Sequence, residues 1–127
     1  MKKVPKVMVC VTRQKTCERL IRVGERIARE NNYELSVVHV VKIGVNFLGN
    51  PDEGEALDYL FSVSKKAGAD MTVLRSENVL NSLVEYAENN GISEIVLGQS
   101  PKSQSDTNIM KQLEQKLPGI KFRIVPS

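Results

Sequence analysis

The hydrophobic residues of this chain fall into two kinds of segment that alternate along its length. Short, continuous runs rich in β-branched residues predict buried strands, at residues 7–11, 35–41, 71–74, 95–97 and 122–125. Between these runs, apolar residues recur at helical spacing, as at Leu20, Ile21, Gly24, Ile27 and Ala28. Strict alternation of strands and amphipathic helices predicts a parallel sheet with helices on both faces, a three-layer α/β/α domain of class α/β.

Polar residues, glycine and proline mark where the predicted helices begin and end. The first helix runs from Thr16 to about Asn32, and Gly68 stops the second. Residues 42–52 are predicted to form a loop, in which Asn50 or Asp52 caps the second helix. The third helix runs from residue 79 to residues 89–91, and the fourth follows a polar loop at residues 98–106 and ends at residues 118–119.

The length and composition indicate one globular domain over residues 1–127. The chain has 127 residues, 41% of them hydrophobic, which is enough for one core without disulfide or metal staples. No apolar run approaches the ~18 residues of a membrane span, and the apolar stretch after Lys3 is too short for a signal peptide. We therefore expect a cytoplasmic protein without membrane insertion. Met1 and the completed fold favour a free protein, although excision from a larger kinase stays open.

The excess of basic residues is mild. Eighteen Lys and Arg stand against fifteen Asp and Glu, a net charge of +3, which does not imply a nucleic-acid partner. Basic residues gather at positions 13–29, but Glu18, Glu25 and Glu30 alternate with them at helical spacing. That pattern is typical of a solvated helix face with ion pairs four residues apart.

The chain is poorly supplied with catalytic side chains. Cys10 lies in a strand and Cys17 at a helix start, and their spacing matches no CxxC motif. His39, the sole histidine, lies within the second strand, where a structural role is expected. No metal-ligand cluster, GxSxG elbow, P-loop or GxGxxG motif is present, so no catalytic or metal-binding residue is assigned. These features favour binding over turnover.

A ligand site is expected at the carboxyl ends of the strands, where ligands bind to open parallel sheets. Residues 105–108, Ser-Asp-Thr-Asn, would cap the fourth helix and leave backbone N–H groups free at its start, an arrangement that attracts phosphate. Positive charge near these ends would come from Arg13, Lys15, Lys42, Arg75 and Lys102.

Five segments together resemble the universal stress protein family over nearly the whole chain. They are residues 7–11 (VMVCV), 17–22 (CERLIR), 35–40 (LSVVHV), 95–100 (IVLGQS) and 117–120 (LPGI). Within the family, the chain is most similar to the domain found in KdpD potassium-sensor histidine kinases. The resemblance implies a five-stranded sheet in the order 3-2-1-4-5, an adenine nucleotide alpha hydrolase-like fold, and a homodimer through the edge of the fifth strand.

ATP-binding members of the family carry a GxxGx9G[ST] loop after the fourth strand. Gly98 matches its first glycine, whereas Pro101 stands at the second and Thr107-Asn108 at the final pair. The aspartate that such members place after the first strand corresponds to Thr12 or Arg13. The resemblance implies candidate nucleotide contacts at Thr12, Arg13, Val41, Lys42, Gly98, Ser100, Lys102, Thr107 and Asn108.

Three functions stay open at this point. The first is a regulatory or stress-response domain that binds ATP or another adenine nucleotide without turnover, or binds none, and acts through dimerisation or a protein partner. The second is a KdpD-type sensing domain for a cyclic dinucleotide or other anionic nucleotide in potassium or osmotic signalling, with Ser100, Lys102, Ser103 and the loop after the first strand as contacts. The third, an ATP hydrolase or phosphotransferase, lacks an identifiable catalytic set, although weak ATP hydrolysis stays open.

Overall fold

The chain folds as the alternation of its hydrophobic segments predicts. The structure is a computed structural model that describes residues 4–98 and 104–126; of residues 104–109 it describes the backbone alone. The strands are β1 (Lys6–Cys10), β2 (Glu34–Lys42), β3 (Asp70–Ser76), β4 (Ile92–Gly98) and β5 (Lys121–Val125). The helices are α1 (Gln14–Asn31), α2 (Glu53–Lys66), α3 (Val79–Asn89) and α4 (Gln104–Lys116), with a short 3-10 turn, η1 (Phe47–Gly49), between β2 and α2.

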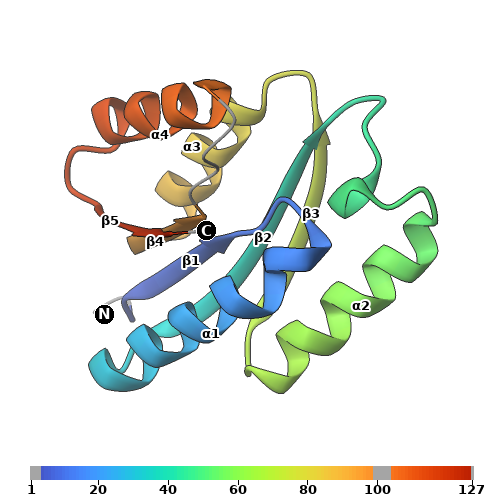
Figure 1. Cartoon of the computed structure of the whole chain (residues 1–127). Helices are drawn as coiled ribbons and strands as arrows, with labels where there is room; N and C mark the ends of the chain where they lie inside the picture. Colours follow the sequence, from blue (N-terminus) through green and yellow to red (C-terminus); the bar gives the residue numbers. More distant parts are fainter. Residues whose placement is uncertain (1–3, 99–103, 127) are drawn as a thin grey trace.

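All strands are parallel and form one sheet in the order β3-β2-β1-β4-β5. Helices α1 and α2 lie on one face, and α3 and α4 lie on the other (Figure 1). The predicted three-layer α/β/α architecture and the strand order implied by the family resemblance are both confirmed. The order places the chain reversal between β1 and β4, where ligands commonly bind to such sheets.

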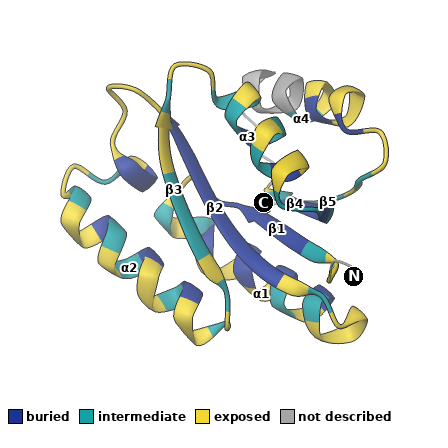
Figure 2. Ribbon diagram, turned by 180° about the vertical axis from the view of Figure 1, so that it is seen from behind, coloured by how far each residue is buried: buried dark blue, intermediate teal, exposed yellow. Residues whose placement is uncertain are grey.

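The sheet separates two hydrophobic clusters. Val7, Val9 and Val37 face α1 and α2, whereas Met8 and Val38 face α3 and α4. This alternation follows from the two-residue period of a strand, and it explains why the central strands read as continuous apolar runs. Burial on both faces is visible along β1 and β2, while β3 at the sheet edge is only partly covered (Figure 2).

The residues predicted to cap or end helices, at positions 31–32, 52 and 68, do so in the structure. The Asp52 side chain accepts the N–H of Glu55 at 3.0 Å and caps α2. Asn32 adopts a left-handed conformation, with φ of 58°, and its N–H donates a hydrogen bond to the carbonyl of Ala28. Gly68 follows α2 with φ of 73°, a conformation that favours glycine.

α1 begins at Gln14, two residues before the predicted Thr16, and the predicted loops before α2 and α4 also differ from the structure. α4 begins at Gln104, inside the predicted loop, so residues 105–108 belong to the helix and do not precede it. No glycine or proline interrupts residues 104–116, so nothing delays helix formation to residue 107. The predicted loop at 42–52 contains the η1 turn, because Phe47 and Leu48 are apolar and become buried.

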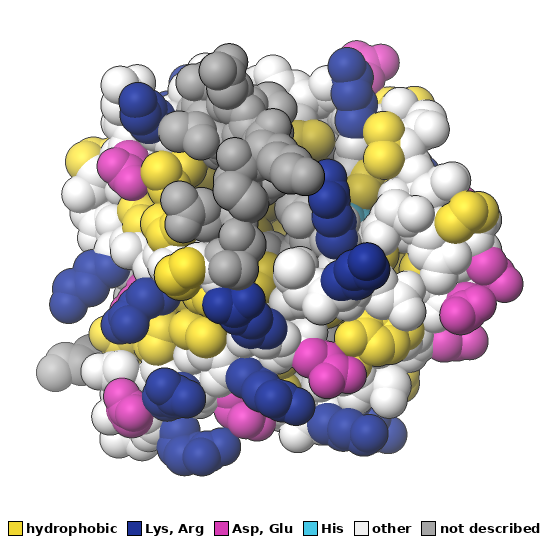
Figure 3. All heavy atoms as spheres, in the orientation of Figure 1, with side chains coloured by type: hydrophobic (Ala, Val, Ile, Leu, Met, Phe, Trp, Pro, Cys, Tyr) yellow, Lys and Arg dark blue, Asp and Glu magenta, His cyan; other side chains and the backbone are white. Residues whose placement is uncertain are grey.

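The basic residues of α1 lie on its solvent side. Arg22 pairs with Glu18 and Arg29 pairs with Glu25, both four residues apart. Figure 3 shows Lys and Arg side chains over the lower part of this face, where α1 lies, with acidic side chains among them. The expectation of a solvated face with ion pairs is confirmed for these residues.

Within the described ranges, no helix combines the length and the apolar character needed to span a bilayer.

Candidate functional site

The carboxyl edge of the sheet is stepped. β1 ends at Cys10, whose neighbours across the sheet are Val38 on β2 and Leu97 on β4. β4 ends one residue later, but β2 continues for four residues beyond Val38, which is about 13 Å at the usual rise per residue. β3 ends level with β2, since Ser76 pairs with Lys42. The ends of β1 and β4 are therefore recessed, because β2 and β3 project beyond them. We call the projecting ends of these two strands the β2–β3 wall, and the level at which β1 and β4 end its foot.

Three predicted site residues lie at the foot of this wall. Thr12 and Arg13 are exposed in the segment that joins β1 to α1, and Arg13 has the extended backbone of a helix N-cap. Gly98 is the exposed last residue of the adjacent strand, β4. A Cβ atom at Gly98 would lie 3.3 Å from a methyl carbon of Leu20, so a side chain there would press against α1. The structure brings these predicted residues to neighbouring strand ends.

Two more predicted residues lie on the projecting end of β2. Lys42 is exposed and offers a positive charge at the edge of the sheet. Val41 is only 7% exposed and packs in the cluster that faces α1 and α2. Its side chain is therefore committed to the core, which leaves the backbone as the part of Val41 that a ligand could contact.

The remaining predicted residues follow β4. Ser100, Pro101, Lys102 and Ser103 lie outside the described residues. Thr107 lies in the first turn of α4 and Asn108 follows it, with only their backbone described. The first turn of a helix has backbone N–H groups without helical partners, and these attract anions. The expected free N–H groups therefore belong to residues from Gln104 onward, three residues earlier than predicted.

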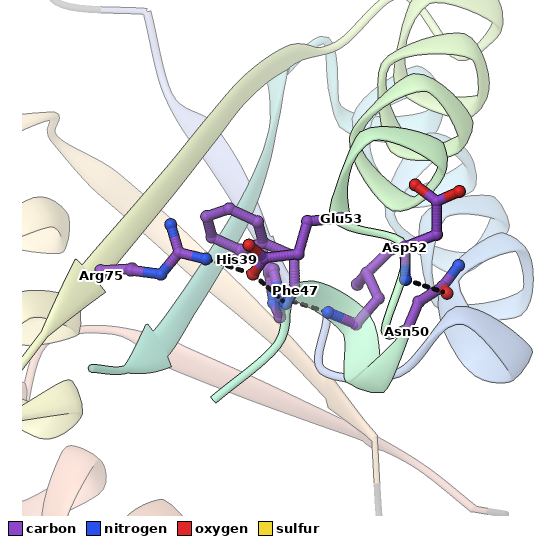
Figure 4. Close-up of polar contacts among 7 residues, drawn as sticks. His39, Phe47, Asn50, Asp52, Glu53 and Arg75 are labelled. Carbon is purple, nitrogen blue, oxygen red and sulfur yellow. Dashed lines mark hydrogen bonds and ion pairs between the residues drawn. The ribbon is translucent and has the colours of Figure 1, made fainter. Parts of the chain in front are cut away.

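The imidazole of His39, on β2, contacts the segment that follows β1 and the η1 turn. Figure 4 shows it beside Phe47 of that turn. Its Nδ1 atom lies 2.7 Å from the Val11 carbonyl oxygen, and its Nε2 atom accepts the Leu48 N–H at 2.9 Å. Burial lowers the pKa of His39 below 6.5, and the bond to Val11 raises it by less. The ring is thus held neutral between backbone groups, consistent with the structural role expected from the sequence.

Arg75 and Glu53 hold the η1 turn from its other side. The Arg75 guanidinium lies over the Phe47 ring, 4.0 Å from its centroid, and is paired with the Glu53 carboxylate. The same carboxylate accepts the Phe47 N–H at 3.2 Å. Figure 4 shows these side chains beside the turn, with Asn50 and Asp52 at its far end. Arg75 was expected to add charge for an anion, but its charge is paired within this cluster.

Both thiols are buried and un-ionised. Burial raises the pKa of Cys10 to about 12. Burial, and to a lesser extent the charge of Glu18, raises the pKa of Cys17 to about 12. The Cys17 thiol donates to the Arg13 carbonyl at 3.1 Å, so it stabilises the start of α1. The expectation that Cys10 is an inert core residue is consistent with these values.

We expect neither thiol to react with DTNB in the folded protein at pH 8. At a pKa of about 12, roughly one thiol in ten thousand is ionised at that pH, and both side chains are shielded from solvent. Two thiols per chain should react once guanidinium chloride unfolds the protein. Rapid labelling of either thiol without denaturant would contradict this burial.

Sequence reasoning missed the cluster formed by His39, Phe47, Leu48, Glu53 and Arg75. Two sequence features could have indicated this cluster: the polar His39 within an apolar strand, and the apolar pair Phe47-Leu48 within a polar loop. What the sequence could not supply was the left-handed conformation of Leu48, with φ of 55°, which turns its N–H toward the imidazole. Tertiary contacts determine that conformation, since leucine disfavours it.

A groove of about 410 Å³ opens at the opposite end of the sheet, far from these strand ends. It lies where β2 and β3 begin and where α1 and α2 end, with Tyr33, Leu35, Gly68 and Asp70 in its wall. The carboxyl edge is the better candidate for an anionic ligand, because the groove is flanked by helix C-termini, which repel anions.

The described residues contain no group of three or more His, Cys, Asp or Glu side chains that could hold a metal ion.

Sequence comparison relates the chain to two groups of proteins. The profile of the universal stress protein family matches residues 3–110. A sensor protein KdpD from Mycobacterium tuberculosis (strain CDC 1551 / Oshkosh) is 29% identical over 125 residues, which are 94% of this chain and 14% of that protein. The KdpD of strain ATCC 25618 / H37Rv is 30% identical over 78% of this chain and 11% of its own length. The chain thus spans about a seventh or less of these relatives.

Solved structures share the fold at low sequence identity. A universal stress protein in complex with cAMP has a TM-score of 0.71 at 14% identity, over 98% of both chains. A universal stress protein from Archaeoglobus fulgidus in complex with dAMP has a TM-score of 0.60 at 18% identity, over 99% of this chain and 98% of that one. UspA from Lactobacillus plantarum has a TM-score of 0.70 at 13% identity, over 99% of both chains.

Proposed function

Because the chain belongs to the universal stress protein family, we propose that it is a regulatory domain that binds an adenine nucleotide at the carboxyl ends of its strands without turning it over. The observation that carries this proposal is the stepped edge of the sheet. The ends of β1 and β4 meet at the foot of the β2–β3 wall, at the point where the chain order reverses. Two relatives of the same fold are complexes with cAMP and dAMP, which supports a nucleotide as the ligand.

The proposed phosphate contacts lie around this step. Arg13 and Lys42 are exposed there and supply positive charge, while Thr12 follows β1 and Gly98 ends the adjacent strand β4. The free N–H groups at the start of α4 would add anion-binding donors, with Thr107 in the same turn. Ser100, Lys102 and Asn108 stay in the proposed set, on the family resemblance, and Val41 contributes its backbone.

Binding without turnover is supported by the chemistry of the described residues. His39 has both ring nitrogens in hydrogen bonds to backbone groups and lies out of reach of solvent. The thiols of Cys10 and Cys17 are buried with raised pKa values, so neither offers a nucleophile. Magnesium-dependent release of phosphate from ATP that is lost in Thr107→Ala would contradict this part of the proposal.

The similarity to KdpD favours a second candidate, a sensing domain for a cyclic dinucleotide. Such a ligand carries two phosphates, and the same edge of the sheet presents Arg13 and Lys42 on opposite sides of the step. The two candidates use one surface and differ in the ligand that binds more tightly. A comparison of mononucleotides with a cyclic dinucleotide therefore separates them.

We also propose a homodimer through β5. β5 is the edge of the sheet beyond β4, and an edge strand presents backbone groups that can pair with another chain. Arg123 on this strand pairs with Glu94 on β4, at 3.8 Å. Analytical ultracentrifugation measures the state directly: a dimer that Ile124→Pro converts to a monomer supports the proposal, and a wild-type monomer at all concentrations contradicts it.

A thermal-shift panel of AMP, ATP, cAMP and cyclic di-AMP tests the nucleotide proposal. A ligand that binds only the native state at 100 times its Kd adds about 2.7 kcal/mol to the free energy of unfolding, a rise of several degrees in Tm. We expect at least one nucleotide to raise Tm in this way, and Lys42→Ala to reduce the rise. Lys66→Ala is the matched control, since Lys66 ends α2 at the opposite end of the sheet. No shift with any nucleotide would contradict the proposal.

A further inference from the structure

The tautomer of His39 is fixed by its two backbone partners. The Leu48 N–H can only donate, so Nε2 accepts at 2.9 Å and carries no proton. The proton therefore lies on Nδ1 and is donated to the Val11 carbonyl at 2.7 Å. The ring is 1% exposed, so water does not replace either bond. One neutral imidazole thus joins the end of β1 to the η1 turn across β2.

The η1 turn depends on this bond because Leu48 has an unfavourable backbone conformation. A non-glycine residue in the left-handed region costs about 1–2 kcal/mol, and Leu48 has φ of 55° and ψ of 18°. Its side chain is buried in the cluster that faces α1 and α2. Phe47 meets the imidazole edge-on, with ring centroids 5.9 Å apart. Burial and the bond to Nε2 together offset the backbone cost.

We propose that His39 is the positioning residue of the nucleotide site. It fixes the η1 turn and the segment after Val11 relative to each other, so that Thr12 and Arg13 on one side and Lys42 on the other keep the separation that a nucleotide requires. This inference rests on the proposed function. His39 acts through backbone groups, since its ring is buried beneath the edge and both nitrogens are engaged.

Protonation of His39 would break this arrangement. A proton on Nε2 would face the N–H of Leu48, so two donors would oppose each other and the turn would lose its anchor. Glu53 and Arg75 pair with each other, so neither favours the charged ring strongly. The titratable side chains on the near ends of the elements around the ring are Arg13, Lys15, Cys17 and Glu18 at the start of α1, Lys42 of β2, Asp52, Glu53, Glu55, Asp58 and Tyr59 at the start of α2, and Arg75 of β3.

The direction of the pH effect follows from burial. The pKa of His39 is lowered below 6.5, so the unfolded chain takes up a proton more readily than the folded protein. The stability that the neutral ring contributes is complete above pH 6.5 and is lost as the pH falls from 6.5 toward the lower folded pKa. The folded protein keeps His39 neutral until the pH approaches that lower folded pKa, so we expect nucleotide affinity to fall only there, at a lower pH than the first loss of stability.

The test compares His39→Gln, His39→Leu and Val38→Ala by calorimetric titration with AMP and ATP. Val38 neighbours His39 but faces the other side of the sheet, so Val38→Ala controls for general loss of stability. We expect His39→Leu to bind about tenfold more weakly, the factor for one lost buried hydrogen bond, and His39→Gln, which keeps an acceptor, to bind less than tenfold more weakly. Val38→Ala should stay within twofold of wild type.

The outcomes separate this inference from the proposed function. Absence of wild-type binding overturns the proposed function. Equal affinity of wild type and a folded His39→Leu overturns the positioning role alone. NMR of the wild type gives a readout that needs no nucleotide: we expect a protonated Nδ1, an unprotonated Nε2 and a protected Leu48 amide whose protection factor falls as the pH approaches the folded pKa of His39. A protonated Nε2 at neutral pH overturns the inference even if nucleotides bind, and so does a Leu48 amide that exchanges freely in the folded protein.

Discussion

Gly24→Val is expected to lower the free energy of unfolding by about 3 kcal/mol, because α1 approaches the sheet too closely at this residue for a side chain. A Cβ atom at Gly24 would lie 2.3 Å from a methyl carbon of Val9 and 3.0 Å from one of Leu35. Val9 is fully buried and its β-branched side chain is stiff, so it cannot move aside cheaply. Urea unfolding followed by circular dichroism measures the loss.

Gly54→Val is the matched control for this substitution. Gly54 also lies in a helix, α2, but the nearest atom to an added Cβ is an oxygen of Asp52 at 3.6 Å, an ordinary contact. We expect a change within about 1 kcal/mol there, since valine and glycine differ little in helix propensity. Equal effects at the two glycines would show that α1 does not approach β1 as the structure has it.

Leu113→Ala is expected to cost about 3 kcal/mol and to weaken nucleotide binding as well. Leu113 is fully buried on α4, in the cluster with Met8, Ile95 and Leu117 that fixes the helix to the sheet. The loss of packing would loosen the helix whose first turn is proposed to hold phosphate. Urea unfolding measures the stability, and titration with AMP at a temperature where the variant is folded measures the binding.

Gln112→Ala is the control that separates the loss of core packing in Leu113→Ala from the effect of alanine on the stability of helix α4. Gln112 is the exposed neighbour of Leu113 on the same helix, so its replacement leaves the core intact. We expect a change within about 0.5 kcal/mol and unaltered binding. A loss as large as that of Leu113→Ala would mean that the exposed face of α4 has contacts beyond those described. A negligible loss in Leu113→Ala would contradict the docking of α4 on β4.

Most of the fold follows from the sequence because buried parallel strands and amphipathic helices have distinct periods. The first strand was predicted one residue late and the other four too short; β3, for example, extends from Asp70 to Ser76, beyond the predicted 71–74. Residues at the ends of β3 are polar or charged, so hydrophobicity alone does not reveal that they pair with β2. The strand order came from the family resemblance, since periodicity does not specify which strands are neighbours.

The candidate site was predictable only in part. The positions of Thr12, Arg13, Lys42 and Gly98 at the carboxyl edge follow from the topology of a parallel sheet. The commitment of Arg75 to Phe47 and Glu53, and the bond from Leu48 to His39, are tertiary contacts. They join residues 9 to 28 positions apart and leave no local pattern, so sequence reasoning placed Arg75 among the free charges.

A titration of ¹⁵N-labelled protein with AMP, followed by two-dimensional NMR, tests most directly whether the carboxyl edge of the sheet is the nucleotide site. We expect shifts concentrated in the amides of residues 11–13, 41–42 and 98 and in the first turn of α4, with little change at Leu35 or Asp70 in the opposite groove. Shifts confined to that groove, or no shift at millimolar AMP and ATP, would contradict this expectation.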